Sequence, residues 1–321
     1  MPTIGSPLLW GLFLALVLVL LALDLGVIHR RQRSIGIREA IVWSLVWTVA
    51  ALGFNLWLAL RFGRQAGVEF LAGYVIERSL SFDNIFVFVV LFHYFSVPDW
   101  LHHRVLFWGI LGALVARGVF IALGAALLSR FDWLLGVLGV FLVYTGVKVF
   151  RGGETRVEPE RNPVLRFFRR FVPMTADYQG RRFLLRREGR LLATPLLLVV
   201  AVVETTDVLF AVDSIPAVFG VTRDSFIVFT SNIFAILGLR ALYFLLAGLM
   251  VQFHYLGYGL GVVLAFVGAK MVLHPWLPIR TEWSLAVVLT VLALSVAASI
   301  LFPRPGPVPD EPGDDLSSPE A

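Results

Sequence analysis

The sequence has no cysteine among its 321 residues and contains only four methionines and six histidines. The missing thiol excludes disulfides, thiolate metal ligands and cysteine nucleophiles. Charge is also scarce, because Asp, Glu, Lys and Arg make up 15% of the chain while hydrophobic residues make up 58%. Soluble domains contain about 25% charged and about 45–50% apolar residues. The composition therefore predicts an all-α polytopic membrane protein, with the lipid bilayer as its surroundings.

Several functional signatures are missing from the sequence as well. It contains no HExxH motif, no Gly-rich phosphate loop and no nucleophile–base arrangement, so we do not expect an enzyme. The net charge is +5, but the basic excess lies in one loop between apolar runs. A nucleic-acid partner is therefore not expected. The sequence carries no information on the oligomeric state.

Long apolar runs divide the chain into about nine candidate transmembrane helices of about 20 residues each. They cover residues 8–28, 40–60, 70–95, 105–128, 132–150, 193–219, 226–247, 254–273 and 283–302. The first run is too long for a signal-peptide core and no Lys or Arg precedes it, so we expect an uncleaved span. The predicted transmembrane domain covers residues 1–302. The Pro- and acid-rich tail 303–321 is expected to be disordered.

The placement of arginine orients these helices. Segment 151–192 carries eleven Arg against five acids, which predicts a basic cytoplasmic loop. Counting helices outward from this loop puts the N-terminus outside and the C-terminus in the cytoplasm. Within the loop, residues 181–195 alternate apolar and basic side chains around Glu188-Gly189, which predicts a short β-hairpin. We interpret the loop as a solvated retention signal, with a binding domain as the alternative.

The chain also repeats itself. Lys148 and Lys270, each in a similar Gly-rich helix, are 122 residues apart, Arg117 and Arg240 are 123 apart, and residues 83 and 207 are 124 apart. Each unit holds three predicted helices, roughly residues 70–150 and 193–273. Because three is odd, the second unit enters the membrane from the opposite side. The pattern predicts a three-plus-three inverted repeat, which in many secondary transporters places the substrate site at the repeat interface.

Carboxylates interrupt two of the apolar runs. Segment VETTDVLFAVDSIP carries Glu204, Asp207 and Asp213, and the earlier segment ERSLSFDN carries Glu77 and Asp83. An Asp at the centre of a membrane helix costs about 3 kcal/mol, whereas each Leu, Ile, Val or Phe returns about 0.5 kcal/mol. These acids should therefore face an ion, water or a counter-charge inside the bundle. We take all five as candidate metal ligands.

The spacing of these acids leaves two arrangements open. Asp207 and Asp213 are six residues apart, as are Glu77 and Asp83. On a regular helix this spacing separates two side chains by about 120° around the axis and about 9 Å along it. Either the acids of each pair lie at different depths along a path, or the helix is locally broken, for which Pro216 is a candidate position.

The donor set indicates a hard cation. Carboxylates with amide and hydroxyl oxygens nearby suit Mg²⁺, Ca²⁺ or Mn²⁺, whereas softer metals call for Cys, Met or clustered His. The candidate supporting residues are Ser81, Asn84, Thr205, Ser214 and Asn232. The adjacent pair His102-His103 lies in a short predicted loop, and we do not take it as a ligand pair.

Structural roles compete with these functional ones. Glu77 adjoins Arg78 and could form a local ion pair with it, while Glu204 could pair with Arg117 or Arg240. Arg117 and Arg240 are themselves the candidate counter-charges for the acids when no ion is bound. Asn232 could serve as an interhelical hydrogen bond. Lys148 and Lys270 lie at helix ends, where a lysine can extend its ammonium to the membrane surface.

Several of these segments resemble the TerC family of integral membrane proteins. They are VETTDVLFAVDSIPAVFGVT, ERSLSFDNIFVFVVLF, TSNIFAILGLRALYF, LALDLGVIHR and RFLLRREGRLLATP, so the resemblance extends from about residue 10 to 300. It implies a multi-pass protein of the bacterial plasma membrane, related to the lysine-exporter-type superfamily. Family members were named for tellurium resistance, and several are implicated in manganese export. The resemblance carries the metal-site role to Glu77, Asp83, Glu204, Asp207 and Asp213, with Asn84 and Asn232 nearby.

Together these observations predict a transporter that exports Mn²⁺, or Ca²⁺ or another hard divalent cation, in exchange for protons. Five carboxylates in a low-dielectric cavity cannot all stay ionised without a cation, which couples metal binding to proton release. The alternative is a membrane partner protein that delivers metal to secreted or envelope proteins, or a component of a metal-stress or tellurium-resistance complex, with the basic loop as its docking surface.

The predicted topology can be tested with reporter fusions. A reporter inserted after Arg170 should be cytoplasmic, and one inserted in the turn 220–224 should be external, because an odd number of helices separates the two positions. Alkaline phosphatase and green fluorescent protein fusions measure the two outcomes. Finding both positions on one side would rule out the inverted repeat.

Overall fold

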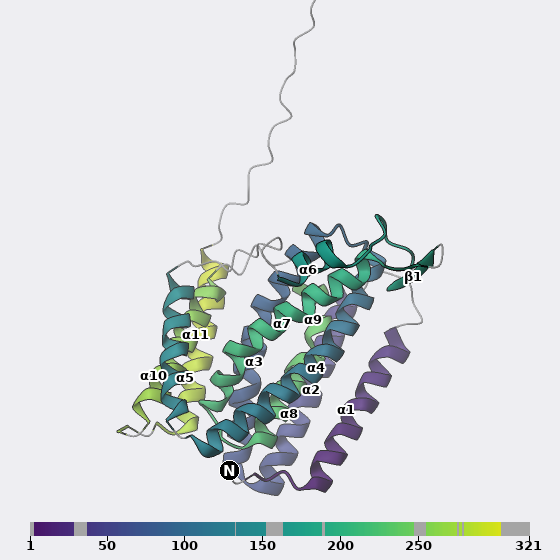
Figure 1. Cartoon of the computed structure of the whole chain (residues 1–321). Coiled ribbons are helices and arrows are strands. Elements are labelled where there is room, and N and C mark those ends of the chain that lie inside the picture. Colours follow the sequence, from purple (N-terminus) through teal and green to yellow (C-terminus); the bar gives the residue numbers. More distant parts are fainter. Residues whose placement is uncertain are drawn as a thin grey trace, which may run out of the picture.

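The computed structural model describes residues 3–28, 37–131, 133–151, 163–187, 190–246, 255–274, 276–277 and 279–302 (Figure 1). At residues 24–28, 82, 83, 86, 163, 164, 169, 190 and 246 only the backbone is described. The predicted acidic tail 303–321 lies outside the described residues.

The described chain forms eleven helices and one two-stranded sheet. The elements are α1 (Pro7–Ile28), α2 (Ile37–Phe62), α3 (Arg64–Tyr94), α4 (Asp99–Arg130), α5 (Leu134–Phe150), α6 (Pro163–Phe171), β1 (Leu184–Arg187), β2 (Arg190–Ala193), α7 (Pro195–Phe219), α8 (Ser225–Leu237), α9 (Leu239–Leu246), α10 (Leu256–Leu273) and α11 (Thr281–Leu301).

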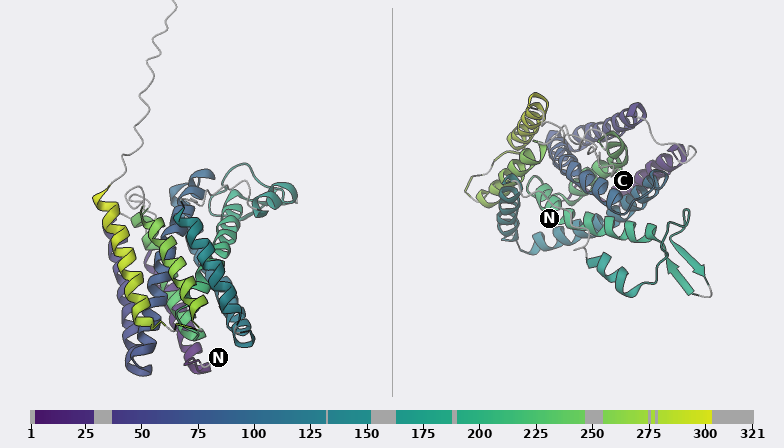
Figure 2. Two further views of the ribbon diagram at one scale, coloured as in Figure 1. Left: turned by 90° about the vertical axis from the view of Figure 1, so that its left-hand side faces the viewer. Right: turned by 90° about the horizontal axis from the view of Figure 1, so that it is seen from above.

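The long helices run side by side in one bundle (Figures 1 and 2). Six segments are long and apolar enough to cross a membrane, namely α2, α4, α7, the α8–α9 segment, α10 and α11. Apolar helices also occur at Pro7–Leu23 and Leu134–Phe150. The predicted all-α polytopic membrane fold is therefore confirmed, whereas the count of nine helices stays a prediction.

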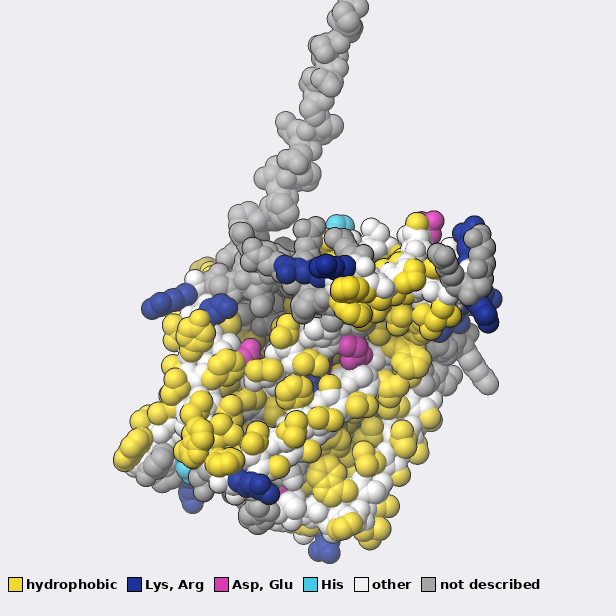
Figure 3. Space-filling view, in the orientation of Figure 1, with side chains coloured by type: hydrophobic (Ala, Val, Ile, Leu, Met, Phe, Trp, Pro, Cys, Tyr) yellow, Lys and Arg dark blue, Asp and Glu magenta, His cyan; other side chains and the backbone are white. Residues whose placement is uncertain are grey.

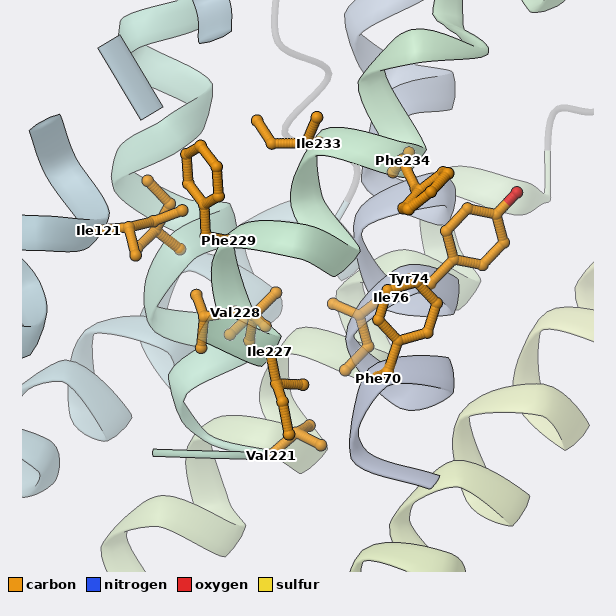
Figure 4. Close-up of a cluster of buried hydrophobic side chains, with 14 of the residues drawn as sticks. Phe70, Tyr74, Ile76, Ile121, Val221, Ile227, Val228, Phe229, Ile233 and Phe234 are labelled. Carbon is orange, nitrogen blue, oxygen red and sulfur yellow. The ribbon is translucent and has the colours of Figure 1, made fainter. Parts of the chain in front are cut away.

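Helix α8 forms the centre of the bundle. All of its residues from Phe226 to Leu237 are buried, as its apolar composition allows. Its side chains pack against Phe70 and Ile76 of α3 and Ile121 of α4 (Figure 4). Lipid is as apolar as these side chains, so close packing rather than water exclusion holds such helices together. Helices α3, α4 and α7 surround α8 and carry the charged residues of the site.

The helix containing α8 is interrupted at Gly238. Arg78 of α3 donates a hydrogen bond from Nη1 to the carbonyl oxygen of Ala235 at 3.1 Å, which satisfies a backbone acceptor at the end of α8. A side chain at Gly238 would collide with the same guanidinium group. Glycine at this position leaves room for the Arg78 guanidinium where the backbone turns from α8 into α9.

The two ends of the bundle are distinguished by their loops. Tyr178, in the predicted basic loop, donates a hydrogen bond to the carbonyl oxygen of Phe95 just after α3. At the other end of α3, Thr222 of the α7–α8 turn donates to Glu69. The 26 residues between Glu69 and Phe95 span about 39 Å of helix. The basic loop and the turn 220–224 therefore lie at opposite ends of the bundle, as the topology prediction requires, while the compartment at each end stays a prediction.

The basic loop contains the predicted hairpin. Strands β1 and β2 pair antiparallel, with Leu184 opposite Ala193 and Arg187 opposite Arg190. The short helix α6 carries Arg166 and Arg170 beside exposed Phe167 and Phe171. The hairpin prediction is thus confirmed, whereas the two interpretations of the loop stay open.

Helices α5 and α10 meet through a reciprocal glycine contact. A Cβ atom added to Gly139 would lie 2.8 Å from the carbonyl oxygen of Gly268, and one added to Gly261 would lie 2.8 Å from that of Gly146. Gly139 and Gly261 occupy equivalent positions in the sequence repeat, as do Gly146 and Gly268. A twofold axis between two equivalent, oppositely directed helices produces this exchange of contacts. The repeat across the complete units stays a prediction.

This contact predicts a difference between two glycines of α5. Gly146→Ala should lower the free energy of unfolding by about 1–3 kcal/mol, because its Cβ would press on the backbone of α10. Gly136→Ala is the matched control, since no atom lies within 4 Å of its Cβ position. Thermal unfolding of the purified protein in detergent measures both. Equal effects of the two substitutions would contradict the close approach.

Candidate metal centre

Arg117 connects four helices at the centre of the bundle. From α4, its guanidinium binds both carboxylate oxygens of Asp207 in α7, with Nε–Oδ2 at 3.2 Å and Nη2–Oδ1 at 3.1 Å. Its Nη1 donates to Glu77 Oε1 in α3 and to Asn232 Oδ1 in α8, the latter at 3.2 Å. Ser214 Oγ lies 3.5 Å from Nη1. We call Arg117, Glu77, Asp207, Ser214 and Asn232 the Arg117 network.

Continuous helices place these side chains at mid-depth. Asp207 is the central residue of α7, and Glu77 lies close to the middle of α3. Neither helix is broken, because α7 continues through Pro216 to Phe219. The alternative of a locally broken helix is therefore wrong. The acids of each segment lie at different depths along an intact helix.

The network is buried and carries one negative charge in excess. Glu77, Arg117 and Asp207 are 0%, 1% and 3% exposed, and they provide two carboxylates for one guanidinium. Within the described residues, Glu77 Oε2 and Asn232 Nδ2 are buried without a hydrogen-bond partner. An uncompensated charge in a low-dielectric interior costs several kcal/mol. The arrangement therefore favours uptake of a proton or a cation beside Glu77.

Glu204 lies next to this network without joining it. It is half-buried one turn before Asp207, and its carboxylate occupies the space above Gly112 of α4, where a Cβ atom would collide with it. In the described part of the chain Glu204 makes no hydrogen bond or ion pair. The ion pair that Glu204 could form with Arg117 or Arg240 is therefore not observed. Gly112, which the sequence analysis did not single out, provides the room for this carboxylate.

Asp213 points elsewhere on α7. It is half-buried, and Lys148 of α5 is the basic side chain that acts on it electrostatically. Asp213 makes no hydrogen bond with the Arg117 network in the described residues. Six residues of intact helix separate Asp213 from Asp207 by about 120° around the axis and about 9 Å along it, as expected for acids at different depths. The role of Asp213 as a metal ligand stays a prediction.

The remaining candidates divide into three groups. The side chain of Asp83 lies outside the description, so its role as a metal ligand stays a prediction. Ser81 and Thr205 donate hydrogen bonds to the carbonyl oxygens of Glu77 and Ala201 in their own helices, and Asn84 is buried in α3. Arg240 is buried in α9 at 2% exposure, and its counter-charge role stays a prediction.

Two local interpretations are settled by this geometry. Glu77 binds Arg117 while Arg78 binds the end of α8, so the two neighbours do not form an ion pair with each other. The interpretation of Asn232 as an interhelical hydrogen bond is confirmed, because its Oδ1 in α8 accepts from Arg117 of α4. Among the described side chains, no three carboxylates or imidazoles are close enough together to hold a metal ion.

The Arg117 network predicts a large effect on stability. Arg117→Met should lower the free energy of unfolding by about 3–5 kcal/mol, because it leaves two buried carboxylates without a counter-charge. Arg130→Met, at the exposed end of the same helix, is the control and should change stability by less than about 0.5 kcal/mol. Intrinsic fluorescence during thermal unfolding in detergent measures both.

A rescue experiment isolates the charge effect. Adding Glu77→Gln and Asp207→Asn to Arg117→Met removes the unpaired charges and should restore most of the lost stability. If the triple variant were as unstable as Arg117→Met, packing of the arginine side chain rather than its charge would explain the loss.

Comparison with known proteins agrees with this architecture. Residues 62–305 match the sequence profile described as the integral membrane protein TerC family. The chain is 48% identical over 309 residues to an uncharacterised membrane protein of Myxococcus xanthus, STKORF319, covering 96% of this chain and 97% of the relative. It is 46% identical over 304 residues to Alx of Escherichia coli (strain K12), named as a candidate membrane-bound redox modulator, covering 92% of this chain and 95% of Alx.

A more distant relative extends the comparison. A membrane protein of Rickettsia bellii is 36% identical over 292 residues, covering 91% of this chain and 97% of the relative. No solved structure matches the chain. The profile match over most of the chain, together with relatives that align over nearly their full length, shows that this protein is a member of the TerC family of integral membrane proteins.

Proposed function

We propose that this protein is a secondary transporter of the bacterial plasma membrane that exports Mn²⁺ from the cytoplasm in exchange for protons. It acts as a carrier rather than as an enzyme, with its N-terminus outside and its C-terminus in the cytoplasm. The observation that supports this proposal most directly is the buried network in which Glu77 and Asp207 share the single guanidinium of Arg117.

The chemistry of this network suits a hard divalent cation. Its acceptor atoms are carboxylate, amide and hydroxyl oxygens, which Mn²⁺, Mg²⁺ and Ca²⁺ prefer. Glu77 Oε2 is already free of hydrogen bonds within the described chain. Glu204, half-buried one turn from Asp207, is the next carboxylate available to an entering ion.

Arg117 supplies the cation of the ion-free state. Its guanidinium occupies the positions at Glu77 and Asp207 that a metal ion would need, so metal binding requires Arg117 to withdraw from at least one of them. When the metal leaves, protons neutralise the carboxylate charge that Arg117 does not balance. Metal is exchanged for protons if only the metal-loaded and the protonated forms of the site reorient across the membrane, because moving an unneutralised buried charge costs several kcal/mol.

A second candidate function is a membrane partner that hands metal to other envelope proteins, or a component of a metal-stress complex. The basic surface on the loop between α5 and α7 supports this candidate, since Arg181, Arg182, Arg186 and Arg187 lie there. The name of Alx adds a redox role as a third possibility. Such a role cannot involve thiols of this chain, because the sequence has no cysteine.

The proposal predicts proton-coupled metal flux. In proteoliposomes, Asp207→Asn should abolish Mn²⁺ movement, because it removes both a ligand charge and a partner of Arg117. Asp99→Asn is the matched control, since the Asp99 side chain is 92% exposed at the end of α4, and flux should persist. Metal flux is measured for Mn²⁺, Ca²⁺ and Mg²⁺ together with a proton-sensitive dye. Metal movement without proton counterflow at any pH would exclude the exchange mechanism.

The two candidate functions separate in a loop-replacement experiment. Replacing residues 163–187 with a flexible linker of equal length should leave Mn²⁺ flux intact if the Arg117 network performs transport. Loss of a metal-dependent phenotype in cells, with flux retained in proteoliposomes, would instead support the partner-protein function.

A further inference from the structure

A cavity of about 950 Å³ lies at the end of the bundle opposite the basic loop. The first turns of α3, the ends of α5, α7 and α10 and the loop before α11 enclose it. Helices α5, α10 and α11 form a group at one edge of the bundle (Figure 1). The cavity is separate from the Arg117 network, since none of the network residues lines it.

The polar group at the inner wall is Lys270. It is 5% exposed and lines the cavity, although lysine at a helix end would ordinarily reach water. Within the described residues, Lys270 makes no hydrogen bond or ion pair. An ammonium group has three donors and no acceptor. Because Lys270 lines the cavity, an occupant with acceptor oxygens would complete its hydrogen bonds there.

The acidic neighbour of Lys270 is already engaged. Glu69 is the carboxylate that acts on Lys270 electrostatically, but its Oε1 accepts a hydrogen bond from Gln65 and its Oε2 accepts one from Thr222. Arg223 and His274 also line the cavity. Of the described side chains that line the cavity, Glu69 is acidic whereas Lys270 and Arg223 are basic, so the lining favours an anion.

The other walls are apolar and open toward lipid. Trp133, Val137, Val140 and Trp276 line the cavity and are also 66%, 50%, 60% and 76% exposed on the outside of the bundle. The space-filling view shows apolar side chains over this side of the molecule (Figure 3). Tryptophan is enriched where membrane helices meet the headgroups. The cavity therefore opens sideways at the depth where a lipid phosphate meets its acyl chains.

We propose that this cavity binds an anionic phospholipid, whose phosphate accepts hydrogen bonds from Lys270 and whose acyl chain lies along Val137 and Val140. A comparison of the two equivalent lysines of the sequence repeat supports Lys270 as the lipid-binding residue. Lys148, the equivalent residue of α5, is exposed and lines no part of the cavity. Only the second unit therefore has the buried lysine that a lipid headgroup needs.

Native mass spectrometry of the full-length protein in detergent tests this site, with phosphatidylglycerol and zwitterionic phosphatidylcholine as probes. The wild type should bind phosphatidylglycerol about tenfold more tightly, the value of one charge-assisted hydrogen bond. Lys270→Gln should abolish this preference, and Lys270→Arg should retain it. Lys148→Gln is the matched control and should behave like the wild type. Equal binding of both lipids by the wild type, or an unchanged preference in Lys270→Gln, would overturn the proposal.

A second variant tests the cavity without altering its charge. Gly136 lines the cavity and has open space at its Cβ position, so Gly136→Trp should fill the apolar wall and reduce phosphatidylglycerol binding by at least about fivefold. Unchanged lipid binding in this variant would place the lipid elsewhere and refute the site. Binding of inorganic phosphate or a free fatty acid in place of phosphatidylglycerol would likewise overturn the assignment to a phospholipid.

Discussion

The arrangement of the central helices depends on one buried guanidinium. Arg117 is 1% exposed near the middle of α4, so bulk solvent does not reach its charge. It is stable there only because α3, α7 and α8 each present an acceptor to it. Polar contacts of this kind specify which helices are neighbours and at which register, since apolar packing in lipid discriminates weakly between alternatives. The same residues that define the helix arrangement are therefore the ones that we propose as the ion site.

Helix α3 shows how the bundle accommodates so many charges. It carries Glu69 near one end and Glu77 and Arg78 near its middle, and each has a separate partner. Glu69 accepts a hydrogen bond from Thr222 in the α7–α8 turn, and Glu77 accepts one from Arg117. Arg78 donates a hydrogen bond to a carbonyl oxygen at the end of α8. Because α3 packs against α2, α7, α8 and α11, these side chains face protein rather than lipid. A helix too polar to cross a bilayer alone is stable as an interior element.

The two units of the sequence repeat share a scaffold but differ in chemistry. The reciprocal contact of Gly139 with Gly268 and of Gly146 with Gly261 follows the repeat closely. Some charged residues do not keep the same surroundings in both units, because Lys148 is exposed whereas Lys270 is buried beside a cavity. Glu77 and Glu204 also lack equivalents in the other unit. The repeat is thus visible in the packing of α5 against α10, whereas Glu77, Glu204 and the buried Lys270 belong to one unit each.

The sequence alone determined the membrane class, the helical fold, the basic hairpin loop and the importance of Glu77, Asp207 and Arg117, because each leaves a local signal. Long apolar runs define the helices, and an acid within such a run demands a partner. Only the tertiary structure decided which partner each charge has. It paired Arg117 with both Glu77 and Asp207, and it placed the guanidinium of Arg78 at the end of α8. It also buried Lys270, which the sequence analysis placed at the membrane surface. Pairing between helices depends on their rotation and register, and these are set by contacts between residues distant in the chain, such as the 90 residues that separate Arg117 from Asp207.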